Sequence, residues 1–567
     1  MAKSVRSDRS DIPEMAGEAE ATKVLIVGGG PVGLSLSIDL SSRGVPHILI
    51  ERSPRAARAD HVRMDQVSIR SMEHARRWGI VADIEAAGFP RHLRRDIVFA
   101  TGVLGMELAR EPIECDALRP APAFSPQKHE LCPQNFFDPL LQTVAERFSC
   151  ADLRYEHRLV DFKESTTGVV ASIQSPAGPY SIEASYLAGC DGAGSQVARQ
   201  LGIAASEAVA LARSTNIFIR SAELTRRAAQ HPAYRYILLD EQGAWASMIN
   251  LNGVDVWRLQ VLGSEDPADW DGAAVDAALA KAIGVRVPYE LMSVVPWTRR
   301  ELIVQRYSKG RSFLVGDAAH QLSPTGGYGM NMGIGEAVDL SWKLAAAIEG
   351  WAGPELLASY DLERRPVALR NARRSTYNFK QMRSVPGEPA MMQQTPAGEA
   401  VRVRIGKAIK QAMSEEWDSM GIHLGYTYRG SPIVVDDGSP PTLDDAALYV
   451  PSAAPGARAP HAWIRPGFST LDLFGRGFVL LAFGDAHGEP LIAAAGKRNV
   501  PMVLERIENP SIACLYERQL VLVRPDGHVA WRGDALPADV GAVVDVVRGA
   551  RPRAIARETT NAEAVLR

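Results

Sequence analysis

Three glycines near the start of the chain, Gly28, Gly30 and Gly33, have the spacing that holds the pyrophosphate of a dinucleotide. A side chain on Gly28 would block a tight turn, one on Gly30 would keep the pyrophosphate away, and one on Gly33 would separate a helix from its strand. Glu51 follows roughly 20 residues later, where a carboxylate can accept hydrogen bonds from both hydroxyls of an adenosine ribose. These four residues predict a binding site for an adenine dinucleotide.

A strand, a helix and a second strand must position these residues. Residues 24–27 are apolar, as in a buried parallel strand, and they end at the first glycine. Pro31 suits the first turn of a helix, where a missing N–H is tolerated, and the helix is expected to end near Gly44. Residues 47–50 are a second apolar strand that ends at Glu51. This order of elements distinguishes a dinucleotide fold from an ordinary glycine turn.

Composition limits the class of protein. A chain of 567 residues is too long for one core, so two or three domains are expected. The net charge of -3 gives no basic field, so nucleic acid is not expected as a partner, although arginine clusters at 55–58 and 91–95 could face a phosphate. Five cysteines without a Cys-x-x-Cys pair indicate reduced thiols in a cytoplasmic protein. Residues 1–22 are expected to be a disordered tail, and no apolar run reaches the roughly 18 residues of a membrane span.

Two further strand ends carry turns of small residues. Asp191 and Gly192 follow one short apolar strand and precede a helix, which Asp191 or Ser195 could simply cap. Residues 313–315 are another apolar strand, which ends in Gly316 and Asp317, and the loop that follows is nearly free of large side chains. Such a loop lets backbone N–H groups and a helix N-terminus approach an anion or the edge of a polar ring, although glycine loops also occur as plain links.

The middle and the end of the chain predict further units. Residues 205–300, with part of 95–130, alternate in the manner of a mixed or antiparallel sheet that forms a second lobe. Residues 391–445 predict a helix and linker, and residues 446–567 a separate α/β domain. Five side chains of the second lobe could line an aromatic pocket, although core packing is the commoner role: Tyr234, Tyr236, Trp245, Met248 and Trp257.

Taken together, the glycine triplet with Glu51, the Asp191-Gly192 turn and the 316–331 segment resemble the flavoprotein aromatic hydroxylases, the para-hydroxybenzoate hydroxylase class. Residues 455–460 and 524–528 resemble the thioredoxin-like extension of the phenol hydroxylase and polyketide hydroxylase branches. The resemblance implies an α/β fold in three parts. These parts are a Rossmann-type FAD-binding domain over residues 23–390, a β-sheet substrate lobe interleaved with it, and a C-terminal thioredoxin-like α/β domain.

The resemblance also implies the chemistry. FAD and NADPH or NADH would be the cofactors, and a phenolic or polycyclic aromatic substrate would be hydroxylated with dioxygen through a flavin hydroperoxide. Glu51 would bind the adenosine ribose, Asp317 the ribityl chain or pyrophosphate, and the backbone of residues 327–331 the isoalloxazine edge. Asp191 would take part in handling both FAD and NAD(P)H. The complete set of implied cofactor-binding residues is Gly28, Gly30, Pro31, Val32, Gly33, Glu51, Arg52, Arg63, Gln134, Asp191, Asp317, Pro324, Gly327, Gly329, Met330 and Asn331.

Several alternatives stay open at this point. The unusual segment between Arg52 and Arg63 leaves Arg58 as an alternative to Arg63. The same scaffold could serve a Baeyer-Villiger or epoxidising oxygenase, an FAD-binding protein without turnover, or a reductase partner. A phenol needs a base or hydrogen-bond relay, which the sequence does not single out, and His320 is more typical of a structural role. The missing Cys-x-x-Cys argues against redox chemistry in the C-terminal domain, and the sequence is compatible with a homodimer without selecting one.

Overall fold

The computed structural model describes residues 20–55, 62, 64–205, 209–263 and 270–551. Its first sheet has five parallel strands in the order β17-β10-β1-β2-β7. Strand β16 pairs antiparallel with β17, and the β8-β9 hairpin pairs with β10. The strands are β1 (Glu20–Val27), β2 (His47–Glu51), β7 (Ala151–Tyr155), β8 (Arg158–Glu164), β9 (Val169–Ser175), β10 (Gly178–Gly189), β16 (Ser308–Lys309) and β17 (Ser312–Leu314).

The first strand starts earlier than expected. Because Glu20 and Ala21 already pair with β10, the first strand begins within the segment 1–22 that we expected to be a disordered tail. The expectation was wrong for residues 20–22 because their polar composition hides a strand end that is stabilised by backbone pairing with a distant segment. Residues 1–19 lie outside the described part of the chain.

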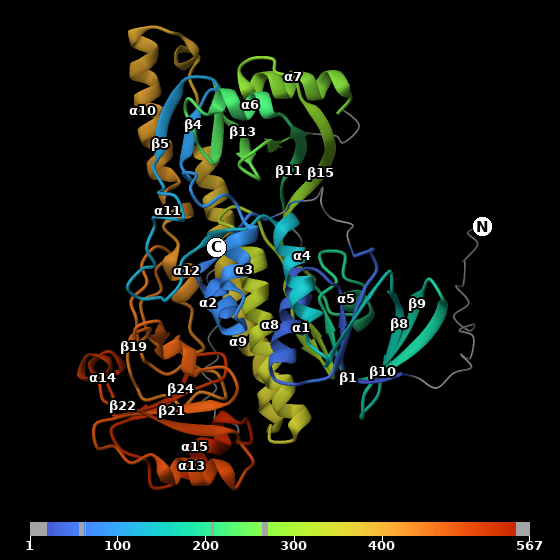
Figure 1. Ribbon diagram of the computed structural model, residues 1–567, viewed down its shortest axis with the longest axis vertical. Coiled ribbons are helices and arrows are strands. Elements are labelled where there is room, and N and C mark those ends of the chain that lie inside the picture. Colours follow the sequence, from blue (N-terminus) through green and yellow to red (C-terminus); the bar gives the residue numbers. More distant parts are fainter. Residues whose placement is uncertain (1–19, 56–61, 63, 206–208, 264–269, 552–567) are drawn as a thin grey trace, which may run out of the picture.

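Helices cover the first sheet. Helix α1 (Pro31–Ser42) packs between α4 (Gln134–Ala145) and α8 (Tyr328–Glu349) (Figure 1). Its apolar residues Leu34, Leu36 and Ile38 are all fully buried, as expected for a helix enclosed on several sides. The other helices around this domain are α2 (Ile69–Trp78), α3 (Val81–Ala87), α5 (Gln196–Leu201) and the long α9 (Pro354–Ser384). A small two-stranded sheet pairs β3 (Gln66–Val67) antiparallel with β6 (Glu130–Leu131), which is distant in the sequence.

The second sheet has eight strands in the order β18-β15-β11-β14-β13-β12-β4-β5. Side chains alternate between its two faces. The outer face packs Ile217, Leu238 and Trp257 beneath α6 (Ala222–Ala228) and α7 (Gly272–Ile283), which lie at the top of Figure 1. The opposite face, which we call the inner face, packs partly against α9 and α10 (Pro396–Ala412). The strands are β4 (Ile97–Ala100), β5 (Glu107–Glu111), β11 (Val209–Arg220), β12 (Arg235–Asp240), β13 (Gly243–Asn250), β14 (Val256–Leu262), β15 (Glu290–Ile303) and β18 (His320–Gln321).

The C-terminal domain is built on a four-stranded sheet in the order β22-β21-β23-β24. Strand β21 is parallel to β22 and antiparallel to β23. Leu480 of β21 joins a hydrophobic cluster on one face and Leu481 a different cluster on the other, so helices cover both faces. The predicted α/β fold class is confirmed. The elements are β21 (Phe478–Phe483), α13 (Glu489–Gly496), β22 (Met502–Ile507), α14 (Pro510–Tyr516), β23 (Leu520–Val523), β24 (Val529–Gly533) and α15 (Val540–Val547), preceded by α11 (Ser414–Trp417), α12 (Met420–Leu424) and the β19-β20 hairpin (Trp463–Arg465, Phe468–Ser469).

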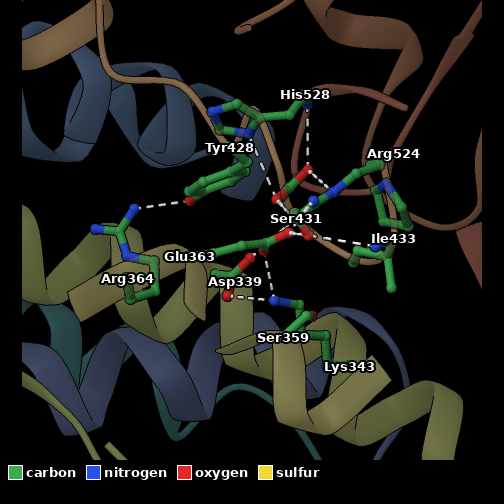
Figure 2. Close-up of polar contacts among 12 residues, drawn as sticks. Asp339, Lys343, Ser359, Glu363, Arg364, Tyr428, Ser431, Ile433, Arg524 and His528 are labelled. Atoms are coloured by element: carbon green, nitrogen blue, oxygen red, sulfur yellow. Dashed lines mark hydrogen bonds and ion pairs between the residues drawn. The ribbon is translucent and has the colours of Figure 1, made fainter. Parts of the chain in front are cut away.

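A buried charge network fastens this domain to α8 and α9 (Figure 2). Arg524, which follows β23, bonds Glu363 of α9 at 2.6 Å and Asp339 of α8 at 3.0 Å. Lys343 of α8 bonds the same two carboxylates at 2.6 and 2.8 Å. These four side chains are at most 1% exposed. A second contact joins the two domains: the Arg458 side chain bonds Glu73 of α2 at 2.9 Å.

Candidate active site

The three sequence motifs meet at the carboxyl edge of the first sheet. Val27, the last residue of β1, is the register partner of Gly189, the last residue of β10. Gly189 is in turn the partner of Leu314, the last residue of β17. The turns that follow these strands therefore begin side by side. In open parallel sheets, ligands bind in the crevice outside such carboxyl ends.

Close packing explains two of the glycines. Gly28 has a φ of +111°, and a Cβ added there would lie 2.4 Å from the carbonyl oxygen of Cys190 in the second motif. A Cβ on Gly33 would lie 2.0 Å from the carbonyl oxygen of Gly28. Val32 contacts the 316–331 segment, because a Cβ on Gly316 would lie 3.1 Å from its Cγ2 atom. The first turn thus contacts both of the others.

Glu51 is buried at the end of β2. Its carboxylate accepts hydrogen bonds from the Gly29 N–H at 2.7 Å and the Ser53 N–H at 2.9 Å, so it holds the glycine turn against the strand end. The proposed contact of Glu51 with a ribose remains a prediction. Arg52 is exposed beside it, whereas Arg63 and its alternative Arg58 lie outside the described residues.

Asp191 and the N-cap residue Ser195 together cap α5, and the Ser195 hydroxyl accepts from the Ala198 N–H at 2.9 Å. The Asp191 carboxylate accepts hydrogen bonds from the Ser195 hydroxyl and the Gln196 N–H, both at 2.6 Å, and from the Val197 N–H at 3.1 Å. The structure therefore supports the capping role that we considered for Asp191, and its role toward FAD and NAD(P)H remains a prediction. Gln134 is buried in the first turn of α4, where its side-chain amide donates to Asp138 at 3.0 Å.

The N-terminus of α8 provides an open cradle. Gly327 has a φ of +68°, and a Cβ added at Gly327 or Gly329 would meet no atom within 4 Å. The backbone N–H groups of the first turn of this 22-residue helix can thus be approached closely, which fits the edge of an isoalloxazine ring. Asp317 and Pro324 are exposed near this turn, and Met330 is partly buried. We conclude that the residues present fit an FAD molecule.

The Asn331 side chain holds this turn in place. Its Oδ1 atom accepts from the Ser68 N–H at 2.8 Å, and its Nδ2 group donates to the carbonyl oxygens of Gln66 at 3.1 Å and Gly327 at 2.9 Å. Beneath the neighbouring turn, the fully buried His320 lies 3.0 Å from Glu336, which also accepts from the Gly316 N–H at 2.8 Å. These contacts support a structural role for His320.

The aromatic side chains considered for a substrate pocket mostly pack the core. Met248, Tyr236 and Trp257 belong to the cluster between the second sheet and α6 and α7, and the Trp257 indole N–H donates to Thr225 at 2.9 Å. Trp245 packs against the same cluster. Tyr234 lies in a separate cluster.

Sequence reasoning missed the polar residues of the inner face. Trp297 and Arg299 of β15 lie there, as does Asn216 of β11. Arg299 is 2% exposed and donates to the hydroxyls of Ser323 at 2.6 Å and Thr325 at 3.0 Å, immediately before Gly327. Burial lowers the pKa of Arg299 to about 10. The inner face thus contacts the turn at which α8 begins. The alternation of polar and apolar residues in β11 was the signal that could have identified it.

Two searches of the described residues bear on other kinds of site. They contain no group of His, Cys, Asp and Glu side chains suited to a metal ion. None of the helices described is both long and apolar enough for a membrane span.

Comparisons with known proteins agree with this geometry. Residues 21–375 match the family model described as "FAD binding domain", and residues 452–550 match "Aromatic-ring hydroxylase, C-terminal". A putative polyketide hydroxylase of Streptomyces halstedii is 31% identical over 551 residues, which cover 91% of this chain and 94% of that protein.

Solved structures show the same relationship. The rebeccamycin biosynthetic enzyme RebC with reduced flavin is 39% identical, with a TM-score of 0.87 over 94% of this chain and 100% of RebC. The flavin-dependent monooxygenase PieE in complex with FAD and substrate is 31% identical, with a TM-score of 0.84 over 95% of this chain and 100% of PieE. The chain therefore belongs to the family of FAD-binding aromatic-ring hydroxylases with a C-terminal domain, and it is an FAD-dependent aromatic monooxygenase.

Proposed function

We propose that this enzyme uses NADPH or NADH and dioxygen to hydroxylate a phenolic or polycyclic aromatic substrate. One observation carries the proposal: the three turns that converge at the first sheet lie next to the polar inner face of the second sheet. Arg299 links the two, because its guanidinium bonds Ser323 and Thr325 just before α8. A flavin held at the turns would thus face a substrate held on the inner face.

The protein's own contribution is binding, orientation and electrostatics. Bound FAD supplies the electron transfer and oxygen activation. The glycine turn after β1 and the implied contact of Glu51 would hold the adenosine end. The N–H groups of the first turn of α8 and the partial positive charge of its N-terminus lie at the cradle formed by Gly327 and Gly329, where they would stabilise negative charge on a ring edge.

The relatives' names support hydroxylation. PieE is described as a flavin-dependent monooxygenase, and the Streptomyces halstedii relative as a putative polyketide hydroxylase. A Baeyer-Villiger or epoxidising reaction on the same scaffold is the alternative, because the fold does not fix the chemistry.

The test is substrate-stimulated oxidation of NADPH and of NADH by the purified holoenzyme, with a panel of phenols and polycyclic phenols. Reaction under isotopically labelled dioxygen, followed by mass spectrometry, should show one labelled oxygen in a ring hydroxyl. Label in a lactone or an epoxide would favour the alternative. Oxidation of neither nucleotide above background, whichever aromatic compound is added, would refute the proposal.

A further inference from the structure

The inner face carries a pair of side-chain amides for which the proposed function has no role so far. Asn216 of β11 and Gln260 of β14 are register partners, and the Gln260 amide nitrogen lies 3.4 Å from the Asn216 carbonyl oxygen. Both strands are interior, because β11 lies between β15 and β14, and β14 between β11 and β13. Both side chains are nevertheless partly exposed. Polar side chains that stay accessible in the middle of a sheet face an open space, not a packed helix.

This amide pair is remote from the point where Arg299 of the second sheet contacts the turn before α8. Asn216 pairs with Val295, and Trp297 and Arg299 follow on the same face of β15. Arg299 contacts the turn that precedes α8. The four residue steps from Val295 to Arg299 span about 13 Å. A single ring held at the flavin cannot cover this distance, whereas a fused polycyclic ring system can.

The pair offers both kinds of hydrogen-bonding group. With the bond between them kept, Asn216 retains N–H donors and Gln260 retains its carbonyl acceptor. Trp297, between the pair and the flavin turn, has a buried indole N–H without a partner among the described residues. Donors and an acceptor in one place suit a hydroxyl group, which is both, or a carbonyl oxygen.

The two arginines of the neighbouring strands β14 and β12 on this face are already paired with carboxylates. Arg258, two residues before Gln260, lies 3.6 Å from Asp65 and donates to the Val62 carbonyl oxygen at 3.0 Å. Arg235 of β12 bonds Glu416 at 2.9 Å. A substrate carboxylate would compete with these two protein carboxylates. The end of the face at the amide pair is therefore better suited to neutral oxygen functions.

We propose that Asn216 and Gln260 determine specificity by binding a neutral hydroxyl or carbonyl oxygen at the end of an elongated polycyclic aromatic substrate that is remote from the flavin. This inference rests on the proposed function and narrows its substrate class. The pair acts by selecting and orienting the substrate, and it does not take part in oxygen transfer.

Two probes that differ in one oxygen test the inference: 2,6-dihydroxyanthraquinone and 2-hydroxyanthraquinone. Their dissociation constants are measured from changes in the flavin absorption spectrum of the oxidised holoenzyme. Wild type should bind the dihydroxy compound about 10-fold more tightly. Asn216→Leu and Gln260→Leu should each remove most of that difference, because a hydroxyl buried without a partner is penalised, and should change binding of the monohydroxy compound less than about 2-fold.

Controls separate this effect from a folding defect. Gln200→Leu removes an exposed amide on α5, which bonds Val160 at 3.0 Å, and should leave both constants unchanged. Flavin content and thermal stability are recorded for each variant.

The outcomes distinguish the two proposals. If wild type hydroxylates an aromatic compound but does not prefer the dihydroxy probe, or if the variants weaken both probes equally or neither, the specificity inference is refuted and the proposed function stands. If wild type shows no substrate-stimulated NAD(P)H oxidation with any aromatic compound, both are refuted.

Discussion

Replacing Arg524 by methionine should loosen the C-terminal domain. Arg524 is fully buried between Asp339 and Glu363, the carboxylates of two helices in the FAD-binding part of the chain (Figure 2). Burial alone would raise the pKa of Glu363, but Arg524 and Lys343 outweigh it and lower that pKa to about 2. The Glu363 carboxylate is therefore ionised at pH 7. In the variant Arg524→Met, Glu363 and Asp339 would have to share one buried cation, Lys343.

The size of the effect follows from the burial of these groups. Removing one partner of a buried ion pair costs about 3–5 kcal/mol, because the remaining charge stays buried without compensation. Adding Glu363→Gln should relieve part of that cost, because Lys343 then serves Asp339 alone, whereas Asp526, which Arg524 also bonds at 2.6 Å, still lacks its arginine. We expect a favourable coupling energy of about 1–3 kcal/mol between the two substitutions.

The assay is denaturant unfolding followed by tryptophan fluorescence, read at the first transition because a multidomain chain need not unfold in one step. Trp342 reports on this interface, since its ring lies 5.2 Å from the Arg524 guanidinium carbon. Arg518→Met is the matched control: Arg518 and Asp534 form an exposed pair at 3.1 Å, and its loss should cost less than about 1 kcal/mol. The reasoning fails if Arg524→Met is as stable as this control, or if the double variant loses the sum of the two single effects.

Three other expectations concern the cofactor turns and the response to pH. Gly33→Ala should yield protein without bound flavin, because the new Cβ would lie 2.0 Å from the Gly28 carbonyl oxygen; wild-type flavin absorbance in the purified variant would contradict this. Asn331→Leu should lower the free energy of unfolding by about 2–4 kcal/mol and weaken FAD binding, because the Ser68 N–H loses its buried acceptor; both are measurable by thermal unfolding with and without added FAD. His423→Asn should make stability less sensitive to acid. Burial lowers the pKa of His423 in α12 from 6.5 to about 4, so the unfolded chain takes up this proton first as the pH falls. The contribution of the neutral His423 to the free energy of unfolding is therefore present above pH 6.5, and about 2 kcal/mol of it is lost by pH 5. Equal losses between pH 7 and pH 5 in wild type and variant would show that another group titrates.

Local rules explain what could be predicted from the sequence. The first strand, its glycine turn and α1 are contiguous in the chain, and the turn at Gly28 needs a positive φ that favours glycine. The strands of the C-terminal domain are short apolar runs between clear turn residues, which is why an α/β domain could be predicted there. In each case the residues that decide the structure are neighbours in the sequence.

Long-range pairing explains what could not be predicted. Asn216 and Val295 face the same space only because β11 and β15 pair in one register, which no local pattern specifies. The sequence also does not show which face of the sheet a side chain lies on. Met248 and Trp257 were therefore candidates for a pocket, although both pack beneath α6 and α7. Buried charges such as Lys343 read as ordinary surface residues until their partners on other elements are known.

Both attachments of the C-terminal domain lead to the same turn of the flavin site. The network at Asp339 holds the middle of α8, about 17 Å along the helix from its first turn. Arg458 holds Glu73 of α2, and the first residues of α2 are tied to that turn through Asn331. A helix is stiff along its axis. The contacts of the C-terminal domain with the middle of α8 and with α2 therefore also fix the position of the N–H groups at the α8 N-terminus. A domain without a Cys-x-x-Cys pair can thus serve catalysis by positioning the flavin cradle, with no redox chemistry of its own.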